Sequence, residues 1–369
     1  MLGQLHASFE ALQVGTIPIS DSLLERTIVA YQAQKRDAPR NISTSGCWDD
    51  HGWNGNLAPL VFALEQGNLV AVRTMFQSLF QTSLSYGIAM GAQELAVVQS
   101  TPRHMEIYQH QWRQTLISVA EAVGAISVHN PELGPDDRQL SASMVFSALS
   151  KKLGVTIDFP QSFGVFGCRQ AECILPTISL QHLHAAWYCA QWLQRDGRRV
   201  VEIGGGFGGL LYYLSKLRRV DYCSYDVPAA IAIQTVFIGA SCPSIRLHLY
   251  GEAKHNHVGP IVRLLPSWLL GLSEARGAEE PADLIINQDT IADLAQEIRE
   301  QILKYIRTVL KGIFISIAPD SSAVSGGLHF SSALAEAGFY LYDRVPFHSR
   351  PGYMREIYHP PGRDGAGLP

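Results

Sequence analysis

The sequence has little net charge and no cysteine framework. Charged residues make up 17% of its 369 residues, and the formal net charge is −4. Attraction to a polyanion such as nucleic acid is therefore not expected. The six cysteines form neither C-x-x-C pairs nor the regular spacing of a disulfide framework. This usage predicts a reduced compartment and therefore a cytoplasmic protein.

Long hydrophobic runs and metal-ligand spacings are also missing. The longest apolar stretch, residues 229–240, is too short to span a bilayer, and the first residues lack a basic patch and an apolar signal core. His255 and His257 form a loop pair without a third ligand nearby, although the chain has 13 histidines. We therefore expect a small-molecule ligand, no membrane partner and no metal.

Apolar residues make up 47% of the chain, which is enough for a large core, and 369 residues exceed one ordinary domain. Helix-period patterns dominate the first half, at 60–80, 116–125 and 179–193. We predict a mainly helical N-terminal domain (1–190), an α/β domain (191–360) and a flexible Gly/Pro-rich tail (361–369). The N-terminal domain has the size to shape an acceptor pocket or the surface of a homodimer.

The most informative motif is the run Glu202-Ile-Gly-Gly-Gly-Phe-Gly208, between an apolar strand and an apolar helix. Its glycines let the backbone turn sharply and approach a ligand closely. The frame G-x-G-x-G differs from the G-x-G-x-x-G of hydride-transfer sites, and Glu202 would repel a phosphate. A neutral or cationic adenosine cofactor such as S-adenosylmethionine (SAM) fits this turn better. In this turn we assign six residues to the SAM site: Glu202, Gly204, Gly205, Gly206, Phe207 and Gly208.

A second acid supports an adenosine cofactor. Asp226 ends the next strand, about 20 residues after the glycine turn, where an acid receives the ribose hydroxyls. Strands at 200–203, 222–226, 245–249, 283–287 and 313–317 alternate with helical patterns, and two extended segments flank Pro351-Gly352. A parallel sheet that ends in an antiparallel hairpin predicts the Rossmann-like, seven-stranded fold of class I methyltransferases.

Polar residues after the fourth main strand are candidates for the reaction face. Asn287 and Gln288 follow a buried run and should face the cofactor or the acceptor, because ligands lie beyond the carboxyl ends of parallel strands. Thr290 is equally well explained as a helix cap. On the preceding helix, His182 or His184 would suit a general base, and we assign His184. Tyr188 would stack on adenine or on the sulfonium. The alternative for His184 and for Tyr188 is that the side chain packs in the core.

The loop 46–54 is unusually rich in functional side chains. It contains two tryptophans, two acids and a histidine within nine residues, and it would close over a polar substrate. In that case His51 would be the base and Asp50 the residue that orients it.

At these residues the chain resembles the sugar O-methyltransferase family over roughly residues 160–350. The likeness runs through 202–209, Tyr225-Asp226-Val-Pro228, Arg263-Leu-Leu-Pro266, 283–287 and the helix that ends in Lys304-Tyr305-Ile306. It implies that Glu202, Gly204, Gly206 and Asp226 hold SAM and that Asn287 lines the methyl-transfer face. The reaction expected from it is an SN2 transfer to a sugar or other small-metabolite hydroxyl, giving S-adenosylhomocysteine.

The chain departs from this family on the acceptor side. Phe207 stands where the family tends to have Tyr, and Ala318-Pro319 replaces a polar Asn after the strand 313–317. These changes leave two alternatives open. The chain is also similar to SAM cyclases of methyltransferase fold, in which the amine of SAM attacks its own γ-carbon to give azetidine-2-carboxylate and methylthioadenosine. The third reading is a cofactor-binding protein without catalysis, because fold alone does not decide among these functions.

Overall fold

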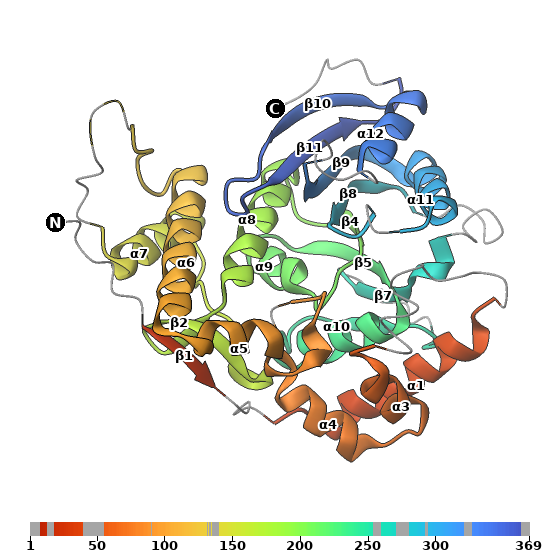
Figure 1. Ribbon diagram of the computed structural model, residues 1–369. Helices are drawn as coiled ribbons and strands as arrows, with labels where there is room; N and C mark the ends of the chain where they lie inside the picture. The colour runs from red at the N-terminus through yellow and green to blue at the C-terminus, as the bar shows by residue number, and fades with distance from the viewer. Residues whose placement is uncertain are drawn as a thin grey trace.

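A computed structural model of the chain is shown in Figure 1. It describes residues 8–12, 18–39, 55–89, 91–130, 132, 134, 140–253, 260–270, 280–291, 294–320 and 327–362. The loop 46–54, with Asp50 and His51, lies outside these residues.

The centre of the fold is an eight-stranded sheet in the order β10-β11-β9-β8-β4-β5-β7-β6. The strands from β4 to β9 are parallel, and β11 runs antiparallel to both β9 and β10. Apart from the three-residue edge strand β6, this is the seven-stranded methyltransferase arrangement that the sequence predicted, including its terminal hairpin. The segment predicted at 245–249 forms only that edge strand, and β7, which was not among the predicted strands, lies between it and β5. The strands are β4 (Arg198–Ile203), β5 (Val220–Asp226), β6 (Leu247–Leu249), β7 (Val262–Pro266), β8 (Ala282–Gln288), β9 (Leu310–Pro319), β10 (Tyr340–Pro346) and β11 (Tyr353–His359).

The sheet is covered by helices on both faces, so its central strands are apolar on both sides. Successive residues of β4 enter different cores: Val200 packs with the α8, α9 and α10 side, and Val201 packs with the α11 and α12 side. The covering helices are α8 (Thr177–Trp192), α9 (Gly209–Leu217), α10 (Pro228–Ser241), α11 (Gln296–Val309) and α12 (Gly327–Glu336). Strand order reverses between β4 and β8, which opens a ligand crevice at the carboxyl ends of these strands.

The N-terminal part is mainly helical, as predicted, and lies along one side of the sheet (Figure 1). Its helices are α1 (Asp21–Asp37), α3 (Ala58–Glu65), α4 (Leu69–Gln77), α5 (Ala92–Ser100), α6 (Pro102–Ala122) and α7 (Ala142–Leu153). Short 3₁₀ turns occupy Leu79–Gln81, Ser83–Ser85 and Gln161–Phe163. The single helical run predicted at 60–80 is divided, because Gly67 adopts a φ of 64° and Asn68 caps a new helix.

A small antiparallel sheet also belongs to this part, with β1 (Phe9–Leu12), β2 (Val165–Gln170) and β3 (Cys173–Leu175). The sequence did not predict it, because strands of three to six residues are too short for a clear periodic signal and β1 pairs with a strand more than 150 positions away.

The N-terminal helices share a core with the main sheet. Buried Leu24 of α1 and Trp112 of α6 belong to the same hydrophobic cluster as Phe237 of α10 and Val200 of β4. Trp112 also donates its indole N–H to the carbonyl of Leu175, 2.8 Å away. None of the described helices is long and apolar enough to cross a membrane.

Candidate functional site

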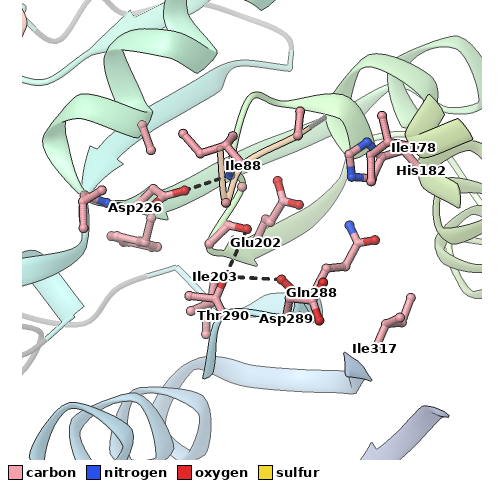
Figure 2. Close-up of a pocket in the computed structure, with 18 of the residues that line it drawn as sticks. Ile88, Ile178, His182, Glu202, Ile203, Asp226, Gln288, Asp289, Thr290 and Ile317 are labelled. Carbon is pink, nitrogen blue, oxygen red and sulfur yellow. Dashed lines mark hydrogen bonds between the residues drawn. The ribbon is translucent and has the colours of Figure 1, made fainter. Parts of the chain in front are cut away.

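A cavity of about 480 Å³ lies at the carboxyl ends of β4, β5 and β8 (Figure 2). One end is formed by the glycine turn after β4 and by the residues that follow β5, β7 and β8. The other end is formed by the N-terminal helices α5 and α6, by α8 and by the β10–β11 hairpin. The predicted turn is therefore part of a cavity that the N-terminal part of the chain completes.

The glycine turn presents bare backbone to this cavity. Gly204, Gly205 and Gly206 line it, and Gly204 has a φ of 78°, a conformation that favours glycine. A Cβ at Gly204 would overlap the hydroxyl of Thr290. Gly208 is not among the described residues that line the cavity. Its N–H donates to the Gly205 carbonyl at 2.9 Å, and it immediately precedes α9.

Asp226 holds the turn in place while it lines the cavity. Its carboxylate accepts hydrogen bonds from the N–H of Gly206 at 2.8 Å and from the N–H of Val227 at 2.7 Å. Burial raises the pKa of Asp226 to about 6, although these backbone donors favour the charged form. The acid after β5 is thus tied to the glycine turn of β4.

Glu202 is a second buried acid in the same space. Its carboxylate accepts a hydrogen bond from the Tyr222 hydroxyl at 2.6 Å, and in Figure 2 it points toward the side chain of Gln288. The pKa of Glu202 is raised to about 8. Burial is the main cause and the charge of Asp226 adds to it, whereas hydrogen bonds from Tyr222 and Gln288 act in the opposite direction. At neutral pH this carboxyl is largely protonated until a positive charge arrives beside it.

The end of β8 turns different side chains to different faces of the sheet. Gln288 and Asp289 line the cavity, and Asp289, with a φ of 64°, forms an ion pair with Arg350 of the hairpin. Asn287 is buried, and its amide oxygen accepts from the N–H of Ile291 at 3.1 Å. It lines a separate cavity of about 40 Å³ instead. The structure therefore brings Gln288 to the main cavity and places Asn287 elsewhere.

The two histidines of α8 also lie in different places. His182 lines the cavity, whereas His184 packs against the hairpin. The Nδ1 of His184 lies 2.8 Å from the Ser349 hydroxyl, and its ring stacks on Phe347 at 4.6 Å. Tyr188, on the same side, lies 4.2 Å below the guanidinium of Arg355. Neither His184 nor Tyr188 is among the described residues that line the cavity. Residues two apart on a helix point about 200° apart, so His184 faces away from His182, and Tyr188, about one turn after His184, shares its side.

Phe207 belongs to an aromatic cluster next to the cavity wall. Its ring lies among Phe80, Phe159 and Phe237, with centroids 5.1 to 6.2 Å away, and it contacts the ring of His182 at 5.1 Å. The structure does not place Phe207 on the cavity wall; it places it in the packing that fixes His182.

Several lining residues were not found from the sequence. The N-terminal helices contribute a carboxyl, a phenol and a carboxamide, α8 contributes a second carboxamide, and other segments contribute the rest. These residues are Ile88, Glu94, Tyr108, Gln111, Gln181, Val227, Trp268 and Arg350. On a helix of unknown partner, such polar residues look the same as residues that face solvent, so no local signal marks them. Within the described ranges, no group of three His, Cys, Asp or Glu side chains could hold a metal ion.

Comparison with known proteins finds likeness only at the level of structure. No protein-family model matches the sequence, and no curated protein matches it. A ribosomal protein L11 methylase from Lactobacillus delbrueckii subsp. bulgaricus is similar, with 14% identity, a TM-score of 0.34, and coverage of 49% of this chain and 80% of that chain. A SAM-dependent methyltransferase from Aquifex aeolicus has 16% identity and a TM-score of 0.34, with 48% and 90% covered.

A third similar structure is the magnesium protoporphyrin IX methyltransferase from Synechocystis PCC 6803 with bound SAM. It has 16% identity and a TM-score of 0.34, and the match covers 49% of this chain and 80% of that chain. Likeness at this level says nothing about substrate. The class I methyltransferase fold of this chain is established by its own strand order.

Proposed function

We propose that the chain is a SAM-dependent O-methyltransferase that acts on a sugar or another small hydroxylated metabolite. The observation that carries this proposal is the two-ended cavity. Its first end has a glycine turn and two buried acids, and its second end has uncharged polar side chains and one carboxyl from the N-terminal helices and α8.

The first end fits SAM in shape and charge. A Cβ at Gly204 would overlap the side chain of Thr290, so this turn keeps bare backbone on the cavity wall. Asp226 is placed to receive ribose hydroxyls, and Val227 and Trp268 are apolar neighbours for adenine. Glu202 would face the cationic part of the ligand, which compensates the cost of burying its charge. When bound, SAM supplies an electrophilic methyl group.

The second end fits a hydroxylated acceptor. Tyr108, Gln111 and Gln181 can each donate or accept hydrogen bonds there. Glu94 is the candidate to take the proton of the acceptor hydroxyl, because partial burial raises its pKa and makes its ionised form a better base. Asp289 is less suited to that role, since it is already paired with Arg350.

This second end is also the reason to prefer methyl transfer to cyclisation of SAM. A cyclase needs its ligand folded in a closed pocket and uses no acceptor. The polar side chains of α5, α6 and α8 would then have no partner in the reaction.

The test is incubation of the protein with SAM alone and then with a pool of sugars and small metabolites, followed by mass spectrometry of the sulfur products. S-adenosylhomocysteine that forms only with the pool is the expected result. Methylthioadenosine with equimolar azetidine-2-carboxylate from SAM alone would establish the cyclase instead. Bound SAM without turnover in either mixture would indicate a non-catalytic binding protein. The variant Glu94→Gln should bind S-adenosylhomocysteine normally and lose most of its turnover.

A further inference from the structure

His182 is a polar side chain of the cavity wall that the protein itself does not satisfy. Its Nδ1 is buried and has no hydrogen-bond partner among the described residues. Phe207 fixes the ring from one side, with centroids 5.1 Å apart. Buried nitrogens are nearly always paired, so an unpaired one on a cavity wall points to a ligand or to a nearby dipole that stabilises it.

The dipole is that of α9. A Cβ built on Gly209, the first residue of α9, would overlap Nδ1 of His182, so this nitrogen lies against the first helical turn. The free N–H groups and the positive end of the helix macrodipole favour an unprotonated nitrogen there. The proton of the neutral ring then sits on Nε2, the other ring nitrogen.

The ring stays neutral at physiological pH. Burial, and then the positive charge of Arg350, lower the pKa of His182 to about 3. A ring of such low basicity is a poor general base, but its remaining N–H is a good hydrogen-bond donor. His182 is therefore suited to hold an oxygen atom rather than to remove a proton.

The cavity offers a ligand partners of both kinds. Arg350 is near enough to His182 to lower its pKa, and the acids Glu202 and Asp226 adjoin the glycine turn. A ligand that carries a carboxylate and an ammonium on one carbon can use both.

We propose that His182, together with the first turn of α9 and Arg350, binds the carboxylate of an α-amino-acid group on the ligand. Under the function proposed above, on which this inference rests, that group is the methionine part of SAM. Arg350 contributes while it is shared with Asp289.

Two probes that differ only by that group provide the test. S-adenosylhomocysteine has the amino-acid end, and methylthioadenosine lacks it. Their dissociation constants are measured by calorimetry for the wild type, His182→Leu and His182→Gln. We expect His182→Leu to weaken S-adenosylhomocysteine about 10- to 100-fold, as for loss of a hydrogen bond to a charged group, and to leave methylthioadenosine unchanged. His182→Gln, which keeps an N–H donor, should recover part of the loss.

His184→Leu is the matched control, because His184 is buried on the same helix and lies away from the cavity. It should lower the melting temperature and leave the ratio of the two dissociation constants unchanged. Equal weakening of both probes by His182→Leu would make His182 a packing residue and overturn the proposal, as would no weakening of either. A wild type that binds neither probe would overturn the SAM function as well.

Discussion

Glu202 and Asp226 place two carboxyl groups in one buried site, and the only arginine that lines the same cavity within the described residues, Arg350, is paired with Asp289. Burial disfavours the charged form of each acid, which raises the pKa of Glu202 to about 8 and that of Asp226 to about 6, and the charge of Asp226 contributes to the shift of Glu202. The free protein therefore carries a proton that a cationic ligand must displace.

Ligand binding should consequently release a proton. A positive charge beside Glu202 lowers its pKa in the complex, so the complex holds fewer protons than the free protein, and affinity rises with pH up to about 8. We expect S-adenosylhomocysteine to bind up to about 10-fold more tightly per pH unit between pH 6 and 8. Calorimetry at pH 7 in two buffers of different ionisation enthalpy measures the released proton. In Glu202→Gln the release should be lost; release that persists unchanged in this variant would assign it to another group.

A comparison of Gly197 with Gly204 distinguishes the cost of backbone strain from the cost of steric overlap, because both glycines have the same φ. Gly197 and Gly204 both have a φ of 78°, but a Cβ at Gly197 meets no atom within 4 Å, whereas one at Gly204 overlaps Thr290. Gly197→Ala should cost about 1–2 kcal/mol of unfolding free energy. Gly204→Ala should cost about 1–3 kcal/mol more and abolish binding of S-adenosylhomocysteine. Urea denaturation and calorimetry measure both, and equal effects of the two variants would contradict a close backbone approach at Gly204.

At the scale of elements, the sequence predicted which segments form helices and strands better than which way their side chains face. The glycine turn and Asp226 were found because a turn and a strand end are marked by residue type. Asn287 was assigned to the site along with Gln288, and His184 was chosen over His182, because β8 is buried on both faces and α8 is apolar nearly all round. Without a polar side, neither element has a periodicity that identifies the face toward a ligand.

The turn that follows the 3₁₀ segment Ser83–Ser85 covers the glycine turn. Ile88 lines the cavity, and its Cγ2 would lie 3.2 Å from a Cβ at Gly206. Its N–H donates to the Ser85 carbonyl at 3.0 Å, which fixes the cover in place. The N-terminal part thus contributes a cover over the glycine turn as well as the polar residues Glu94, Tyr108 and Gln111 of the cavity wall.

Shortening this cover should let the ligand leave faster. Ile88→Ala removes apolar contact over the glycine turn, and we expect the dissociation rate of S-adenosylhomocysteine to rise about fivefold, with little change in association. Surface plasmon resonance gives both rates. Val70→Ala on α4, where the side chain is 69% exposed, is the control and should change neither. An unchanged dissociation rate in Ile88→Ala would show that Ile88 does not retain the ligand.

At the scale of the whole molecule, one hydrophobic cluster joins the N-terminal helices to the sheet. Leu24 and Trp112 share it with Phe237, and Arg26 of α1 binds Glu252 beyond β6 at 2.8 Å. The predicted boundary at 190/191 falls just before the end of α8, which packs against α6 and α9. Contacts between residues this far apart in the sequence produce no local sequence pattern. The N-terminal helices could therefore be predicted, but their packing against the sheet could not.

A shared core predicts a single unfolding transition. Urea denaturation followed by far-UV circular dichroism and by tryptophan fluorescence should give coincident midpoints, since Trp112 and Trp268 report from the two parts of the chain. S-adenosylhomocysteine at about 100 times its dissociation constant should add about 2.7 kcal/mol to both curves. Separate midpoints, with only the later one moved by the ligand, would indicate two parts that unfold independently.

The cavity wall runs from Gly87 on the N-terminal side to Arg350 in the hairpin, and β11 must insert between β9 and β10 to set that hairpin. During translation the residues emerge in order, and the early helices appear long before their partners. The wall of the cavity is therefore complete only after residue 350 has left the ribosome. A nascent chain that already contains the glycine turn and Asp226 still lacks the hairpin side of this wall, so we expect full affinity for the ligand to arise only late in synthesis.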